Sequence, residues 1–303
     1  KDRPKYFGLG TAQKVGVKDY VDTLAHNRAI QMLVVSASTD KLFMSTMSNS
    51  TVMICLFGII FGNYAAFSSY SQITSIPIAL ISILLMNKIA RQMGQKASMM
   101  TGTYGGIIGS IIITLFLVFV NPRGDASKFA IPAFRIIRPD TWGTLFTGWS
   151  AVGLIFILLV IAWRGVQALS SSIVITMTAD CADYEVYRTG KYVPGLMGTL
   201  FSFVDKLVSS FAPMVAGIMF SMCGFTDHNP VMGDPVTPGL RMGVVFCAYG
   251  MIMIGLVCNL IAMKFYPLTK EKMEEIQDEV AQIKMKTMAC LLYTSPSPRD
   301  LST

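Results

Sequence analysis

The chain has 303 residues, of which 52% are hydrophobic and 14% charged, and its mean hydropathy is +0.53. Soluble domains carry about 25% charged residues, so this composition excludes an ordinary soluble fold. The net charge of +7 does not indicate a nucleic-acid surface, because the basic residues lack interleaved aromatic residues and fall mainly between apolar segments. The six cysteines show neither CxxC nor Cys/His spacing, and we predict neither a disulfide nor a metal site.

Six apolar segments of about 20 or more residues follow one another along the chain. A helix of about 20 residues crosses the roughly 30 Å hydrocarbon core of a bilayer, so each segment is predicted to span a membrane. The predicted spans are residues 30–61, 65–86, 98–120, 145–177, 196–222 and 242–266. The expected fold class is therefore an all-α integral membrane protein, with a six-helix transmembrane bundle over residues 30–266.

The positions of lysine and arginine predict the orientation, since cytoplasmic loops retain more of them. They gather before the first span and after the second, fourth and sixth. These residues are Lys1, Arg3, Lys5, Lys14, Lys18 and Arg28; Lys88, Arg91 and Lys96; Arg188 and Lys191; and Lys270, Lys272, Lys284 and Lys286. The loop between the third and fourth spans, which is also basic, is the exception. We expect both ends to be cytoplasmic, in a plasma membrane of the bacterial inner-membrane type.

Polar segments flank the predicted bundle. Residues 1–29 are polar and basic and contain no apolar signal core, so we expect them to be a cytoplasmic middle loop of a longer protein. The chain changes abruptly to a Ser-, Pro- and Thr-rich composition near its other end. We expect residues 288–303 to be a non-native or disordered tail.

Residues 267–287, after the last span, have helical periodicity. Apolar side chains recur there at three- and four-residue spacing and fall on one helical face, while Thr269 can cap the helix. The apolar residues are Met273, Ile276, Val280 and Ile283. The pattern predicts a cytoplasmic amphipathic helix, with a solvated tail that is helical only part of the time as the alternative.

Charged residues inside the spans are the first candidates for function. Asp40 and Lys41 lie in the first span, Arg164 in the fourth and Lys206 in the fifth. A charge within a bilayer costs at least a few kcal/mol, so such residues usually face a cavity or a partner. We predict that they line a substrate or cation pathway, together with Trp163 and Gln167, because an indole ring can stack on a sugar.

Each of these residues also has a structural interpretation. Lys206 can form an ion pair with an acid on a neighbouring helix. Arg164 can bind backbone carbonyls at an unwound helix end. The first span can begin near Leu42, which would leave Asp40 and Lys41 at the membrane interface.

A charged segment, TADCADYEVYRTGKYVPG over Thr178–Gly195, is predicted to form the loop between the fourth and fifth spans. Acids stand at the end of the helix and basic residues follow them. They are Asp180, Asp183, Glu185, Arg188 and Lys191. Such a cluster can form ion pairs between two domains that close one side of a transporter. On composition alone it is a charged loop.

The order of residues in this segment resembles a family signature. Asp180 precedes Asp183-Tyr184, which is followed by Thr189-Gly190-Lys191 and, in the next span, by Lys206. This arrangement resembles the glycoside–pentoside–hexuronide:cation symporters, the melibiose-carrier-like branch of the major facilitator superfamily. Weaker matches are Leu24-x-x-Asn27-Arg28 before the first span and Phe265-Tyr266-Pro267-Leu268-Thr269 after the last, so the resemblance covers about residues 20–286.

The resemblance implies both a fold and a mechanism. Members of that family have two six-helix bundles, each built of two inverted three-helix repeats, with the substrate between the bundles. The six spans here would be helices seven to twelve, the C-terminal half. Such a protein carries a sugar or glycoside together with Na⁺ or H⁺ by alternating access. The coupling cation would be bound mainly by residues of the N-terminal half. No other cofactor is implied.

The same resemblance implies roles for individual residues. Lys206 would face the central cavity, and the cytoplasmic gate would include Asp180, Asp183, Tyr184, Glu185, Arg188, Thr189, Gly190 and Lys191. The expected partners are the substrate, the cation, the lipid bilayer and the N-terminal half. We find no constellation for catalysis and predict no enzyme. A membrane sugar sensor or scaffold that kept the carrier fold without transport remains the alternative.

Overall fold

The computed structural model describes residues 16–121, 125–131, 148–189 and 194–294, and within these it describes the side chains except at residues 17, 19, 86, 171, 194–196 and 283–294. All regular elements in these residues are helical, which agrees with the predicted all-α class. They are α1 (Val17–His26), α2 (Arg28–Met47), α3 (Ser50–Met53), the π-helix η2 (Ile54–Ile60), α4 (Tyr64–Met93), α5 (Gln95–Val120), the 3₁₀ turn η3 (Ala126–Phe129), α6 (Ala151–Thr189), α7 (Pro194–Ser209), α8 (Ala212–Met222), α9 (Pro238–Val245), the π-helix η5 (Phe246–Gly250), α10 (Met251–Phe265) and α11 (Lys270–Thr294).

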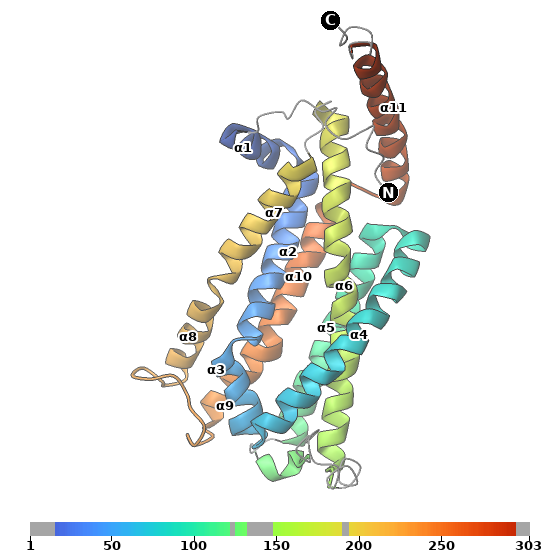
Figure 1. The fold of residues 1–303 in the computed structure, drawn as a ribbon. Coiled ribbons are helices and arrows are strands. Elements are labelled where there is room, and N and C mark those ends of the chain that lie inside the picture. Colours follow the sequence, from blue (N-terminus) through green and yellow to red (C-terminus); the bar gives the residue numbers. More distant parts are fainter. Residues whose placement is uncertain (1–15, 122–124, 132–147, 190–193, 295–303) are drawn as a thin grey trace, which may run out of the picture.

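The long helices run side by side along one axis of the molecule (Figure 1). In the described residues, five helical stretches are long and apolar enough to cross a membrane, and there are six if the bent pair of α2 with α3–η2 counts as one span. These stretches fall on the six predicted segments. The protein is thus a multi-pass membrane protein. Helices α1 and α11 lie at one end, called the α11 end below, and η3 lies at the other.

Asparagine side chains set where three helices begin. Asn27 Oδ1 accepts a hydrogen bond from Ile30 N, Asn49 Oδ1 from Thr51 N and Asn63 Oδ1 from Ala66 N. Each side chain satisfies a backbone donor that the first turn of a helix leaves unpaired. The cap at Asn49 starts α3 at a 53° angle to α2, so the first predicted span is a bent helix pair.

Glycines allow α5 and α6 to lie in close contact. A Cβ atom built on Gly105 would stand 2.7 Å from Val166 Cγ1, and one on Gly109 would stand 2.7 Å from Trp163 Cδ1. Gly102 and Gly106 approach Ser170 and Gln167 in the same way. Small residues are typical of helix interfaces in membranes, because apolar side chains gain little by leaving lipid and close packing must supply the attraction.

A buried polar chain joins α2, α10 and α5. Ser36 Oγ donates to Asn259 Oδ1 at 2.6 Å, and Asn259 Nδ2 donates to Thr103 Oγ1 at 2.9 Å. All three side chains are buried. Because these three side chains are hydrogen-bonded to one another, the network fixes the relative position of the three helices and satisfies the polar groups that it buries.

Helix α6 corrects the prediction of a loop from Thr178 onward. The helix continues to Thr189, because no glycine or proline interrupts the chain before Gly190 and because Cys181 and Val186 are buried against the bundle. At 1.5 Å per residue, its 39 residues extend about 58 Å, well beyond a 30 Å hydrocarbon core. The charged segment is therefore mostly helical, and it forms the projecting end of α6.

Helix α11 packs against the end of α6. Met273, Ile276 and Val280 are buried in a cluster that includes Met177, while the side chain of Ile283 lies outside those described. Thr269 Oγ1 accepts a 3.4 Å hydrogen bond from Lys272 N at the helix start. The helix continues to Thr294, within the residues expected to be a tail, and residues 295–303 lie outside the described part.

Candidate substrate cavity

A cavity of about 870 Å³ lies among α2, α4, α6 and α7. Its size suits a small ligand, and its polar lining comes from all four helices. The polar and charged lining residues are Asp40, Lys41, Ser48, Gln72, Ser75, Arg164, Gln167, Ser202, Asp205 and Lys206. The structure thus brings together five of the six residues expected in a substrate or cation pathway, from three helices that are distant in sequence.

An ion pair crosses one side of this cavity. Lys41 Nζ of α2 lies 3.5 Å from Asp205 Oδ2 of α7, and the two side chains are 45% and 27% exposed. Sequence analysis missed Asp205. The signal was present, because Asp205 is a charged residue inside an apolar stretch and directly precedes Lys206. The test that selected the other four charged residues would also have selected it.

Lys206 and Asp40 have no such pairing. Among the described residues, no hydrogen bond or ion pair is made by the ammonium of Lys206 or by the carboxylate of Asp40. Lys206 stands in the last turn of α7, just before the break at Ser210–Phe211 that separates α7 from α8. The negative end of a helix dipole favours a cation there, so the ammonium is stabilised while it remains open to the cavity.

Arg164 has one fixed contact and also lines the cavity. Its Nη1 donates a 2.9 Å hydrogen bond to the backbone carbonyl of Ser71 on α4. This contact partly matches the structural interpretation, although Ser71 lies within a helix rather than at an unwound end. A guanidinium has five N–H donors, so a single carbonyl leaves donors for a ligand. Gln167 is mostly buried beside it, with Nε2 4.0 Å from Met44 Sδ.

Trp163 does not line the cavity. Its side chain is 2% exposed, its indole N–H donates to Ser110 Oγ at 2.9 Å, and its ring packs edge-on against Tyr249. One residue along a helix turns a side chain by about 100°, so Trp163 faces α5 and η5 while Arg164 faces the cavity. The indole is thus a packing residue of the α5–α6 interface in this structure.

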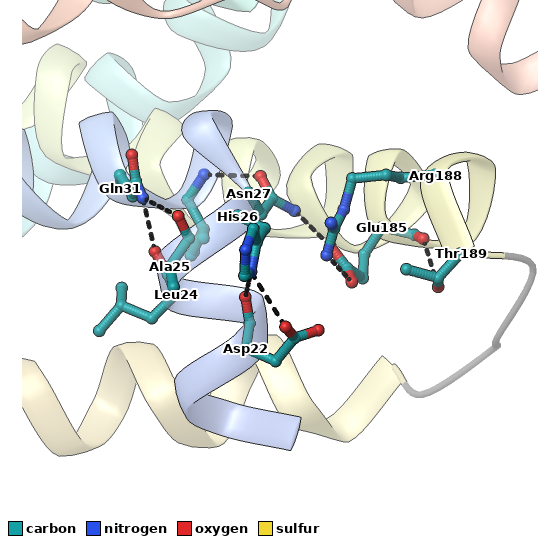
Figure 2. A network of polar contacts seen from close by, with 10 residues as sticks. Asp22, Leu24, Ala25, His26, Asn27, Gln31, Glu185, Arg188 and Thr189 are labelled. Atoms are coloured by element: carbon teal, nitrogen blue, oxygen red, sulfur yellow. Dashed lines mark hydrogen bonds and ion pairs between the residues drawn. The ribbon is translucent and has the colours of Figure 1, made fainter. Parts of the chain in front are cut away.

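A polar network at the α11 end joins the start of α2 to the end of α6 (Figure 2). Asn27, which caps α2 with its Oδ1 atom, donates through Nδ2 to Glu185 Oε2 at 2.8 Å. Arg188 Nη2 donates to Glu185 Oε1 at 2.8 Å, and the Thr189 hydroxyl donates to the Glu185 carbonyl. Glu185 and Asn27 are buried, so the described part of this cluster holds two helices of the same bundle together.

The remaining residues of the expected gate lie nearby on α6. Asp180 is buried and interacts with the side chain of Gln95 at the start of α5. Tyr184 stacks on Tyr187 with ring centroids 6.3 Å apart, and Asp183 directly precedes Tyr184 on the same helix. Gly190 and Lys191 lie outside the described residues.

Comparison with known proteins gives a consistent picture. The sequence model of a family described as "MFS/sugar transport protein" matches residues 3–270. A "Glucuronide carrier protein homolog" of Escherichia coli strain K12 is 28% identical over 160 residues, which cover 52% of this chain and 33% of that protein. A "Putative sulfoquinovose importer" of Salmonella typhimurium strain LT2 is 27% identical over 137 residues, covering 45% of this chain and 28% of that protein.

The alignments cover only part of each relative. The matched stretches span about a third or less of the length of the two curated proteins. Their names describe a carrier and an importer. The match of residues 3–270 to a sugar transport family confirms the prediction that the chain is a carrier rather than an enzyme.

Proposed function

The chain belongs to the MFS/sugar transport protein family, and we propose that it forms the C-terminal half of a cation-coupled symporter for acidic sugars. In this proposal its spans are helices seven to twelve, arranged as two inverted three-helix repeats, and the cavity among α2, α4, α6 and α7 faces the other half. Na⁺ or H⁺ would be bound mainly by that N-terminal half. The two halves would work by alternating access in a bacterial inner membrane, with both ends cytoplasmic.

The charge balance of the cavity is the observation that carries the substrate class. Three cations, Lys41, Arg164 and Lys206, line it together with two acids, Asp40 and Asp205. One cation is therefore left without a counter-charge, and Lys206 has no ion-pair partner in the described part of the chain. An acidic sugar would supply the missing negative charge through strong charge-assisted hydrogen bonds.

The names of the relatives support the same class. A glucuronide carries a carboxylate and sulfoquinovose a sulfonate, and the two relatives are named for these compounds. Polar groups in the cavity, such as Gln72 and Ser75 of α4, would bind the sugar hydroxyls. The Trp163 ring has no part in this arrangement, because it packs against α5 instead.

We assign the gate to the projecting end of α6. Asp180, Asp183, Tyr184, Glu185, Arg188 and Thr189, with Gly190 and Lys191 beyond them, would contact the N-terminal half when the cytoplasmic side closes. Glu185 supports this role, because the carboxylate already ties α6 to the start of α2 through Asn27. A movement of α6 would then be transmitted to α2 and to the cavity charges that α2 carries.

Uptake measurements test the proposed function. The complete reading frame containing this chain is expressed in cells that lack uptake of methyl glucuronide, and uptake of methyl glucuronide and methyl glucoside is measured with and without a Na⁺ or H⁺ gradient. We expect gradient-dependent uptake of the glucuronide. Lys206→Met should abolish most of it, and Lys264→Met, at an exposed position outside the cavity, should not. Absence of uptake for every acidic sugar would favour the sensor or scaffold instead.

A further inference from the structure

Asp205 is paired across two helices. It lies near the C-terminal end of α7, directly before Lys206. The counter-charge comes from another helix, since Lys41 Nζ of α2 lies 3.5 Å away. Both partners line the cavity and both are partly exposed to it, at 45% for Lys41 and 27% for Asp205. A ligand in the cavity can therefore reach either partner of this pair.

The two lysines of the cavity differ in their state. Lys41 is neutralised by Asp205, whereas Lys206 has no ion-pair partner among the described residues. An acidic ligand that binds Lys206 brings a second anion close to Asp205, the adjacent residue on α7. Like charges repel at such separations, so the approach of the ligand weakens the hold of Asp205 on Lys41.

We propose that Asp205 competes with the acidic group of the substrate for Lys41. When the substrate binds, its acidic group replaces Asp205 as the partner of Lys41. The substrate class in this proposal rests on the proposed function. An anionic group can replace Asp205 on Lys41, because it supplies the counter-charge and a charge-assisted hydrogen bond to the ammonium. A neutral sugar has no such group. Asp205 is thus a specificity-determining residue that also favours release, since it re-pairs with Lys41 when the substrate leaves.

The competition makes a quantitative statement about affinity. A ligand that requires Lys41 unpaired binds with an apparent dissociation constant equal to its intrinsic value divided by the fraction of the time that Lys41 is unpaired. Partly exposed ion pairs are modest in strength, so removal of the competitor should tighten binding of an acidic sugar about threefold to tenfold. Binding of a neutral sugar should not change. A loss of structural support would instead weaken both.

Binding to the purified full-length protein in detergent tests this idea separately from transport. Isothermal titration with methyl glucuronide and with methyl glucoside compares the wild type with Asp205→Asn and Asp205→Glu. We expect Asp205→Asn to bind the glucuronide about threefold to tenfold more tightly, with Asp205→Glu close to the wild type because it keeps the pair. Tighter binding without any uptake would refute the proposed transport while supporting the competition.

A double-mutant cycle separates competition at Lys41 from a general change of charge. In the Lys41→Met background, Asp205→Asn should no longer tighten glucuronide binding, because the lysine for which the two anions compete is gone. An equal gain in both backgrounds would mean that Asp205 acts only through the overall field of the cavity, and would overturn the proposal. Unchanged or weaker binding of methyl glucuronide by a folded Asp205→Asn protein would also overturn the proposal. The same holds if neither the wild type nor Asp205→Asn binds it.

Discussion

Along α5, glycines place the backbone directly against α6, whereas along α7 a charged residue meets α2 across the side of a cavity. The first interface leaves no space, since an added Cβ at any of Gly102, Gly105, Gly106 and Gly109 would stand 2.5–2.8 Å from a neighbouring atom. The second includes an ion pair whose partners a ligand can reach. Closely packed side chains fit in one arrangement. An ion pair can exchange one partner for another ion of the same charge.

This difference indicates that two parts of the bundle have different roles, one in stability and the other in substrate binding. Helices α5 and α6 form one closely packed unit, and the hydrogen bonds through Ser36, Asn259 and Thr103 join α2 and α10 to α5. Helix α7 is separated from α8 by a break, and it carries two of the five charged residues that line the cavity, Asp205 and Lys206, near its C-terminal end. Substitutions in the packed interface should therefore act on stability, and substitutions on α7 should act on the substrate.

The largest effect is expected at Gly105. Replacement by valine introduces a branched side chain where a single Cβ would already lie 2.7 Å from Val166 Cγ1, and Val166 is branched and stiff. Overpacking of this kind should destabilise the protein by about 3 kcal/mol. Thermal unfolding of the purified protein in detergent measures the effect. Gly217→Val is the matched control, because a Cβ at Gly217 has no neighbour within 4 Å; equal losses would show that the close α5–α6 contact is unimportant.

The next effect concerns the contact between α2 and α6 at the α11 end. Glu185→Ala removes the acceptor of the fully buried Asn27 amide and of Arg188, and an unsatisfied buried donor costs about 2 kcal/mol. A lower melting temperature in detergent is expected. Glu275→Ala serves as the comparison, because Glu275 pairs with Lys272 at an exposed surface of α11 and should leave the melting temperature nearly unchanged. Equal values for both variants would contradict the assigned role of Glu185.

Hydropathy predicted the positions of the spans but not their internal breaks or faces. The six apolar segments were sufficient for the membrane fold, because length and apolarity decide whether a helix can cross a bilayer. The bend at Asn49 depends on a side-chain cap, and the continuation of α6 through Asp180 and Glu185 depends on packing against α2 and α5. A hydropathy average over a window of residues shows neither the bend nor the continuation of α6.

The candidate site was predicted in outline for a similar reason. Charges within spans are costly, so Asp40, Lys41, Arg164 and Lys206 indicated a cavity before any contact was known, and all four line one. The partner of a charge is a tertiary property, however, and the sequence could not say that Lys41 meets Asp205. The direction in which Trp163 points is equally tertiary, because a neighbouring residue on the same helix faces elsewhere.

On the cavity side, Lys206→Met should act on the substrate and leave stability unchanged. The ammonium has no partner in the described part of the chain, so its removal breaks no internal contact. Loss of one charge-assisted contact should raise the half-saturation concentration for an acidic sugar about tenfold, equal to roughly 1.4 kcal/mol. Uptake kinetics and a melting temperature on the same preparation measure both quantities. A fall in melting temperature as large as that of Glu185→Ala would place Lys206 in the packed interface.

The smallest effect is expected for Trp163→Phe. This substitution compares the packed α5–α6 interface with the cavity most directly, because Trp163 and Arg164 are neighbours in sequence. The substitution keeps an aromatic ring against Tyr249 but removes the indole N–H that donates to Ser110. Loss of one neutral hydrogen bond should cost about 1 kcal/mol of stability. Half-saturation concentrations for acidic sugars should stay the same, since the indole does not line the cavity. If Trp163→Phe instead weakened substrate binding with the melting temperature unchanged, the ring would be stacking on the sugar in some state of the transport cycle, and the α5–α6 interface would be less rigid than its glycines indicate.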